Sequence, residues 1–105
     1  MTTVKFFLEN NKVSGFETGG HSSFDCDDEE GKTVCAAVSS ACYMAANTVT
    51  EIIGDSACAD IRDGYMKFTV NSPCDKTAAV LSGLKLHIEQ LSEQYSNRVR
   101  IITEV

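Results

Sequence analysis

The sequence predicts an α+β fold of two layers, in which two helices cover a mainly antiparallel sheet in the element order ββαββαβ. Three observations indicate this fold. Five segments alternate apolar and polar residues, and two longer segments repeat apolar residues at helical spacing. Strands patterned for burial on one face only favour an antiparallel sheet. The 105 residues, 43% of them hydrophobic, suit a single domain over residues 1–105.

The first two strands are expected to form a hairpin. Residues 3–9 have the two-residue period of a half-buried strand. Asn10-Asn11 then tolerates the positive φ angles of a tight turn, which would place Phe6 opposite Gly15. We therefore predict an antiparallel pair of strands at the start of the chain.

An acidic segment separates this hairpin from the first helix. Residues 21–32 contain like charges at positions 25–30, and their repulsion predicts a mobile loop. The helix is expected over residues 33–53, closed by Gly54. Its predicted apolar stripe consists of Val34, Val38, Ala41, Cys42, Ala45, Val49, Ile52 and Ile53.

A second hairpin follows, because residues 57–62 and 65–70 alternate around Asp63-Gly64, a strong signal for a two-residue turn. This register pairs Asp60 with Lys67 on one face. The other face is expected to point into the core and carries Ala59, Ile61, Met66 and Phe68.

The second helix is expected to begin at Ser72-Pro73-Cys74-Asp75, with Ser72 as the capping residue. A last strand is expected over residues 98–105. The apolar stripe of the helix consists of Val80, Leu81, Leu84, Ile88, Leu91 and Tyr95. Gly83 within this helix suggests close contact with another element or a second subunit, so a homodimer is expected.

Charge and composition restrict the partners and the compartment. The net charge is −6 and Lys and Arg are scattered singly, so direct nucleic-acid binding is not expected and a basic polypeptide is a better partner. Neither a leader pattern nor a membrane-spanning apolar run occurs, which predicts a cytoplasmic protein that does not bind membranes. Cysteines in that compartment are expected to be reduced: Cys26, Cys35, Cys42, Cys58 and Cys74.

Cys35 and His21 are the residues best placed for chemistry. If Thr33 caps the helix, Cys35 occupies about the second helical position, where free amides and the helix dipole favour a thiolate and could hold an oxyanion. His21 follows Gly19-Gly20 at the end of the second strand. A histidine within reach of such a thiol would serve as its base. From spacing alone, a structural cysteine is the more common outcome.

Other reactive residues have simpler interpretations. Cys42 and Cys58 are expected to pack in the core, and Cys26 is expected to be an incidental exposed thiol. The acidic segment lacks the spacing of a calcium loop, since Ala36 stands where the bidentate Glu belongs. Zinc-ligand spacings are absent too, so we expect neither a metal nor another cofactor.

Two stretches resemble the bacterial ribosomal-processing cysteine protease family, called Prp: Gly20-His21 and Val34-Cys35-Ala36-Ala37-Val38-Ser39. The resemblance implies that Cys35 is the nucleophile and His21 the general base. It also implies a substrate, the N-terminal extension of bacterial large-subunit ribosomal protein twenty-seven. Small residues around the pair leave room for a substrate side chain and form the expected substrate-binding set: Gly19, Gly20, Ala36 and Ser39.

This chain departs from the family pattern just before the nucleophile, where Gly31-Lys32-Thr33 replaces the usual aspartate. If an aspartate orients His21, Asp27 or Asp28 must take that place, or none does. Two other functions stay open at this point. One is a noncatalytic ribosome-associated binding module, and the other is a thiol redox sensor that uses Cys35 with Cys26.

Overall fold

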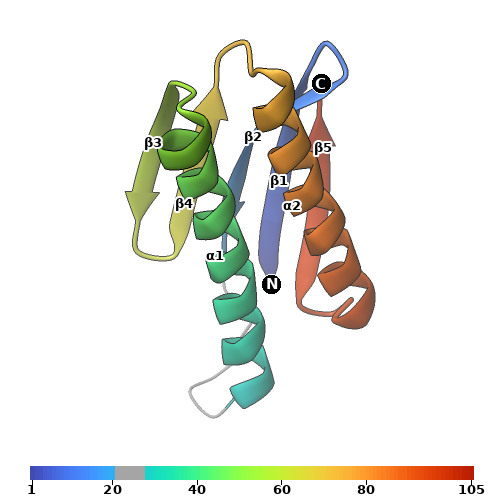
Figure 1. Cartoon of the computed structure of the whole chain (residues 1–105). Helices are drawn as coiled ribbons and strands as arrows, with labels where there is room; N and C mark the ends of the chain where they lie inside the picture. The colour runs from blue at the N-terminus through green and yellow to red at the C-terminus, as the bar shows by residue number, and fades with distance from the viewer. Residues whose placement is uncertain (21–27) are drawn as a thin grey trace.

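The computed structural model describes residues 1–20 and 28–105, and in this part of the chain two helices cover one face of a five-stranded sheet (Figure 1). The element order confirms the predicted ββαββαβ fold. The elements are β1 (Thr2–Glu9), β2 (Lys12–Gly19), α1 (Glu29–Asn47), η1 (Thr48–Ile53), β3 (Ala57–Arg62), β4 (Tyr65–Val70), α2 (Asp75–Gln94) and β5 (Val99–Glu104).

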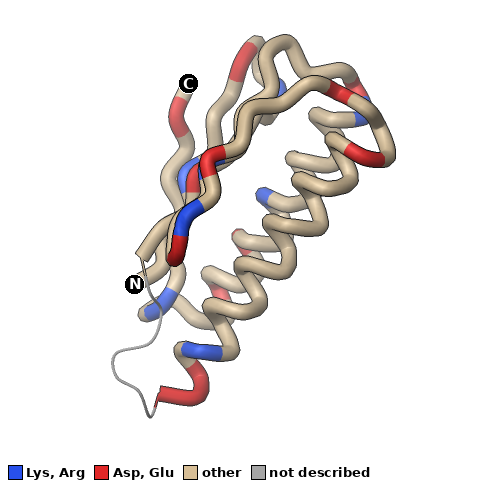
Figure 2. Tube along the Cα trace, turned by 90° about the vertical axis from the view of Figure 1, so that its left-hand side faces the viewer, with Lys and Arg blue, Asp and Glu red and all other residues tan. Residues whose placement is uncertain are grey.

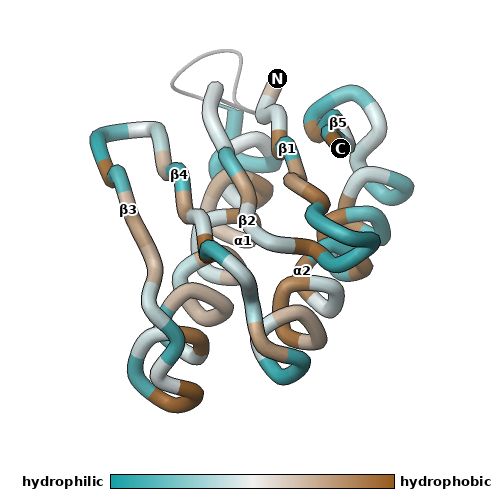
Figure 3. Tube along the Cα trace, turned by 90° about the horizontal axis from the view of Figure 1, so that it is seen from above, coloured by the Kyte–Doolittle hydropathy of each residue, from teal (hydrophilic) through white to brown (hydrophobic). Residues whose placement is uncertain are grey.

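The strands lie in the order β3-β4-β2-β1-β5. Among the described strands, the β1–β5 pair is parallel and the other three pairs are antiparallel, so the sheet is mainly antiparallel, as predicted. The helices form a separate layer on one side of the sheet (Figure 2). Seen from above, α1 and α2 lie next to each other beneath the strands (Figure 3). Because β1 and β5 run parallel, Thr2 at the start of β1 lies opposite Val99 at the start of β5, although almost the whole chain separates the two residues.

The first hairpin has the predicted turn but a different register. Asn10 and Asn11 have φ angles of 53° and 65°, as the tight turn requires. Phe6, however, lies opposite Phe16 and not opposite Gly15, because a bulge shifts the register by one residue beyond the turn. The bulge lets both phenylalanine side chains point into the core, where each is fully buried.

Helix α1 begins four residues earlier than predicted. Its first residue is Glu29 and its N-cap is Asp28, so residues 28–32 are not the loop that their charge suggested. Acidic side chains at a helix start are favourable because they oppose the positive end of the helix dipole. The remainder of the predicted loop, residues 21–27, lies outside the described residues.

The other end of this helix widens into the π-helical segment η1, which ends at Gly54 with a left-handed φ of 84°. Gly54 therefore ends the helix, as predicted. Its amide bonds to the carbonyl of Val49, five residues back, at 2.9 Å. The wider turn changes the helical period. Ile52, predicted to be buried, is 79% exposed.

Strand β3 is paired as predicted but is not buried as predicted. Asp60 lies opposite Lys67, and the Asp63-Gly64 turn is present. Ala59 and Ile61 were expected in the core, yet both are exposed. The reason is that β3 is the outermost strand, beyond the area that the helices cover (Figure 1).

Helix α2 begins at Asp75, with Cys74 as its N-cap, so the predicted cap at Ser72 is wrong. The capping carboxylate comes from Asp55, which precedes β3. It accepts hydrogen bonds from the Cys74 amide at 3.1 Å and from the Thr77 hydroxyl at 2.7 Å. The predicted stripe packs inward, with its central residues buried: Leu81, Leu84 and Ile88.

The core lies between the two layers. Its largest fully buried side chains come from three strands and from α2: Phe6, Phe16, Phe68, Leu81 and Ile88. Both layers contribute to a single buried cluster in the part of the chain that the structure describes. Among the described helices, none is long and apolar enough to cross a membrane.

Candidate active site

Cys35 is the seventh residue of α1 and is partly exposed. The expected position in the first helical turn is therefore wrong. Amides without helical partners belong to the first turn, which lies four to six residues before Cys35, and the Asp28 carboxylate already accepts a hydrogen bond from the Gly31 amide. Groups that lie beside the helix are therefore better placed than its terminal amides to stabilise a Cys35 thiolate.

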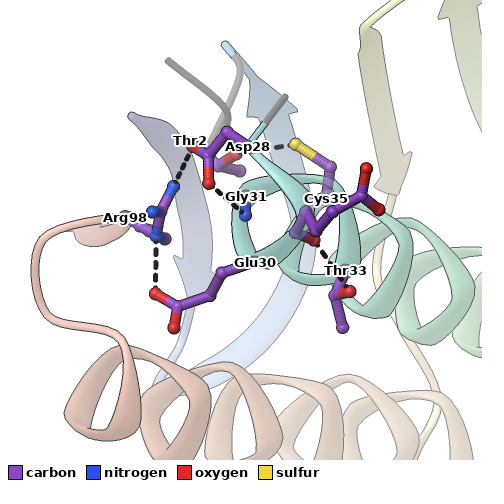
Figure 4. Close-up of polar contacts among 8 residues, drawn as sticks. Thr2, Asp28, Glu30, Gly31, Thr33, Cys35 and Arg98 are labelled. Carbon is purple, nitrogen blue, oxygen red and sulfur yellow. Dashed lines mark hydrogen bonds and ion pairs between the residues drawn. The ribbon is translucent and has the colours of Figure 1, made fainter. Parts of the chain in front are cut away.

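The start of α1 is held by one arginine. Asp28 accepts a hydrogen bond from the Gly31 amide at 3.0 Å, and the same carboxylate pairs with the guanidinium of Arg98. Arg98 also donates to Glu30 at 2.8 Å (Figure 4). The side chains of Arg98 and Asp28 are only 14% and 12% exposed. These contacts raise the pKa of Arg98 above its ordinary value, chiefly through the hydrogen bond with Asp28.

Arg98 also touches the strand beside the nucleophile. Its carbonyl accepts a hydrogen bond from the Thr2 amide at 2.9 Å, where β5 begins beside β1. The hydroxyl of Thr2 lies 3.9 Å from the sulfur of Cys35 (Figure 4). Thr2 is 4% exposed. Arg98 thus links the start of α1, through Asp28, to Thr2 of β1, whose side chain contacts the Cys35 thiol.

A cavity of about 240 Å³, here called the Cys35 cavity, opens beside this sulfur. Helix α1 supplies one wall, and the ends of β1, β2 and the β3–β4 hairpin supply the other. Its lining includes Thr2, Gly20, Cys35, Ser39, Tyr43 and Tyr65. The sulfur therefore lies where a group of a bound molecule can reach it.

The structure brings some of the expected site residues together and separates others. Gly20 and Ser39 line the Cys35 cavity with the thiol. Gly19 instead lines a hollow on the open face of the sheet, and Ala36 is an exposed residue of α1 that does not line the cavity. His21, the expected base, lies outside the described residues.

Gly20 could not be another residue without a local change. Its φ is 86°, in the left-handed region, and a Cβ atom there would lie 2.4 Å from the carbonyl oxygen of Met1. The glycine lets the end of β2 pass closely over the N-terminus. That close approach brings the chain directly before His21 to the wall of the Cys35 cavity.

The other cysteines are distinct from Cys35 in their surroundings. Cys42 is fully buried, as predicted, and burial raises the pKa of its thiol to about 12. Cys58 was expected in the core but is exposed, because it lies on the edge strand β3. Cys74 is exposed at the start of α2. Cys26 lies outside the described residues.

Sequence reasoning missed Thr2 and Arg98. Neither lies near Cys35 in the sequence, and the strand pattern alone does not tell which strands are neighbours. The available signal was topological: pairing of the last strand with the first would have placed Arg98 beside Thr2. As for metals, the described residues include no cluster of three or more His, Cys, Asp or Glu side chains that could hold an ion.

The fold and the site define a class: a small two-layer α+β protein with an accessible thiol on the wall of a cavity, as a thiol-dependent enzyme requires. Over residues 1–100 the sequence matches the family described as Cysteine protease Prp. The chain belongs to this family of cysteine proteases. A comparison with curated protein sequences finds no match.

Solved structures share the fold. The ribosomal processing protease Prp from S. aureus, in complex with a substrate peptide, is 16% identical, covers 99% of this chain and 100% of its own, and has a TM-score of 0.87. The same protease with a covalently linked product peptide is 18% identical, with the same coverage and a TM-score of 0.86. SMU.848 from Streptococcus mutans is 24% identical over 99% of this chain and 96% of its own, with a TM-score of 0.78.

Proposed function

We propose that the whole chain, residues 1–105, acts as a single cysteine endopeptidase domain with Cys35 as nucleophile and His21 as general base. The observation that carries this proposal is the partly exposed Cys35 thiol at the wall of a cavity, in a chain of a cysteine protease family. Gly20, the residue directly before His21, lines the same cavity, which supports the pairing of the two residues.

The reaction follows from the chemistry of a thiol and an imidazole. His21 takes the proton of Cys35, and the thiolate attacks the scissile carbonyl to form a tetrahedral intermediate. The imidazolium then gives its proton to the leaving amine, which leaves a thioester on Cys35. Water, deprotonated by His21, hydrolyses the thioester and restores the thiol. Ser39 lines the cavity with a hydroxyl that can contact the bound peptide.

The proposed substrate is the N-terminal extension of bacterial large-subunit ribosomal protein twenty-seven, processed in the cytoplasm. The Prp structures from S. aureus, which share this fold, contain a substrate peptide or a product peptide of a ribosomal processing protease. The net charge of −6 also favours encounter with a basic ribosomal protein. The protein needs no cofactor for this chemistry, because the thiol and the imidazole supply it.

The test is incubation of the protein with ribosomal protein twenty-seven that carries its N-terminal extension, followed by mass spectrometry of the products. The wild type should release the extension, and Cys35→Ala and His21→Ala should not. Cys58→Ala is the matched control, since it removes an exposed thiol on the edge strand and should cleave normally. Cleavage by either Cys35→Ala or His21→Ala would remove that residue from the mechanism.

We also propose that the protein acts as a homodimer that is assembled through its helix layer. A groove of about 700 Å³ between α1 and α2 is lined mainly by apolar atoms, and Met44, one of its lining residues, is 63% exposed. Gly83 lines this groove, and a Cβ atom at Gly83 would meet no other element of the described chain within 4 Å.

Sedimentation equilibrium tests the dimer: the wild type should give twice the chain mass, and Met44→Glu should give the mass of the monomer. A wild-type monomer at all concentrations would contradict this proposal.

A further inference from the structure

The thiol of Cys35 needs a source of stabilisation other than the start of its helix. The amides of α1 that have no partner within the helix belong to its first turn, where Asp28 accepts a hydrogen bond from one of them, and Cys35 is its seventh residue. A thiolate there gains from hydrogen-bond donors packed against this side of the helix. One such donor is the hydroxyl of Thr2, the first residue of β1, which lies 3.9 Å from the Cys35 sulfur.

The Thr2 hydroxyl is held in place from several sides. Thr2 is 4% exposed, so water does not compete freely for its side chain. Its amide is bonded to the Arg98 carbonyl at 2.9 Å, and it lies opposite Val99 in the parallel pair of β1 and β5. A β-branched side chain has few rotamers, so a fixed backbone also fixes the hydroxyl.

The direction of this hydrogen bond depends on the state of the sulfur. The oxygen–sulfur distance is 3.9 Å, and with a neutral thiol either atom can be the donor. A thiolate carries no proton, so the Thr2 hydroxyl must then donate. Hydrogen bonds to charged groups are stronger than those between neutral groups. The contact therefore favours the ionised form of Cys35 over the neutral form.

We infer that Thr2 is a positioning residue for the nucleophile, whose hydroxyl donates to the Cys35 sulfur, stabilises the thiolate and holds it at the cavity wall. This inference rests on the proposed role of Cys35. Nothing in the sequence pattern marks Thr2, which begins a strand and lies 33 residues before Cys35. The contact arises because β1 lies beneath the first half of α1 (Figure 4).

The test compares Thr2→Val, which keeps the shape and removes the hydroxyl, with Thr2→Ser, which keeps a hydroxyl. The rate of Cys35 alkylation by iodoacetamide is measured from pH 5 to pH 10, and peptide mapping separates this thiol from the other four. Loss of one donor to a charged group should slow alkylation at pH 7 about 3- to 10-fold and move the profile to higher pH. Thr2→Ser should retain a profile close to that of the wild type.

The control is Thr3→Val, which removes a hydroxyl from the next residue of the same strand, on the opposite face of the sheet. It should leave the Cys35 profile unchanged. If Thr2→Val does not fold, Thr2→Ala replaces it, and the comparison with Thr2→Ser is the same.

A profile for Thr2→Val that matches the wild type would overturn the inference, even if Cys35→Ala abolishes cleavage. Equal shifts in Thr2→Val and Thr2→Ser would also overturn it, because a packing defect and not the hydroxyl would be the cause. Failure of the proposed function appears differently, as peptide cleavage that persists in Cys35→Ala. Alkylation needs no substrate, so the two results are independent.

Discussion

Two glycines have nearly the same backbone angle but different surroundings, so substitutions at them distinguish the cost of backbone strain from the cost of a steric clash. Gly20 has a φ of 86° and Gly54 has a φ of 84°. A Cβ atom at Gly20 would lie 2.4 Å from the Met1 carbonyl oxygen, whereas at Gly54 nothing lies within 4 Å. A residue with a Cβ atom would carry the cost of a left-handed angle at either position. At position 20 it would also require the N-terminus to move.

We expect Gly54→Ala to cost about 1 kcal/mol, the usual cost of a left-handed backbone angle for a residue with a Cβ atom. Gly20→Ala should cost about 2–4 kcal/mol, because the overlap with Met1 adds to the same strain. Urea unfolding of the two variants and the wild type measures the difference. Equal costs would show that the N-terminus moves aside freely. Gly20→Ala should also slow peptide cleavage, since Gly20 lines the Cys35 cavity.

At the scale of single residues, local chemistry was predictable and long-range contacts were not. The positive φ angles of Asn10 and Asn11 follow from the side chains themselves, and the structure confirms them. Cys35 was singled out by the residues around it, and it does lie at a cavity. Thr2 was not singled out, because its role depends on which part of α1 lies above β1.

At the scale of elements, the start of α1 shows why local charge misled the prediction. Repulsion among the acidic residues indicated a loop, but the stabilising charge comes from Arg98, which follows Asp28 by 70 residues. A carboxylate at the N-cap and another in the first turn then become favourable, since they pair with the same guanidinium. The sequence of residues 21–32 alone does not indicate that Arg98 pairs with Asp28.

Replacement of Arg98 should therefore loosen the start of α1. In Arg98→Met, the amides of the first two turns should exchange with solvent about tenfold faster, because Asp28 and Glu30 lose their shared partner. Hydrogen–deuterium exchange with mass spectrometry measures this change. The matched control is Lys32→Met, which removes an exposed pair with Glu29 at 3.5 Å in the same turn. Similar exchange in both variants would contradict a special role for Arg98.

The start of α2 depends on a carboxylate from elsewhere in the chain. Asp55 precedes β3, yet it accepts hydrogen bonds from the Thr77 hydroxyl and the Cys74 amide. These bonds, the one from Thr77 first, lower the pKa of Asp55 below the ordinary 3.8. Ser72 was predicted as the cap because it is nearest in sequence, but its φ of 55° turns the chain before the helix begins.

The lowered pKa makes this contribution to stability dependent on pH. A carboxyl group whose pKa is lower in the folded than in the unfolded state stabilises the fold above the unfolded value and ceases to do so as the pH falls through the folded value. Asp55→Asn should thus lower the Tm by about 2–6 °C at pH 7. The difference from the wild type should shrink as the pH falls below 3.8. A difference that stays constant down to pH 2 would contradict this account.

At the scale of the whole molecule, the layers were predictable and the strand order was not. Alternation of apolar residues tells which face of a strand is buried, and the hairpin turns tell which sequential strands pair. The β2–β4 and β1–β5 pairs join segments that are distant in sequence, and no local pattern specifies them. The burial of β3 was predicted wrongly for the same reason, because its position at the edge is a property of the complete sheet.

The complete sheet also creates a row of alternating charges on its open face. The register places Asp60 opposite Lys67, Lys67 opposite Glu17, and Glu17 opposite Lys5, across β3, β4, β2 and β1. The Nζ atom of Lys5 lies 3.9 Å from Oε1 of Glu17 and 3.3 Å from Oε2 of Glu104 on β5. Opposite charges in neighbouring strands attract, so this row favours the observed strand order over others.

Reversal of the central charge should reveal how much the row contributes. Glu17→Lys would place a third positive charge between Lys5 and Lys67, and we expect a loss of about 1–2 kcal/mol in the free energy of unfolding. Glu17→Gln removes the charge but keeps an acceptor for the Tyr65 hydroxyl, so it should cost less. Urea unfolding at 20 mM and 500 mM NaCl measures both, and salt should reduce the cost of Glu17→Lys by screening the repulsion. If the two substitutions cost the same at both salt concentrations, packing around Tyr65, and not the alternation of charge, explains the contribution of Glu17.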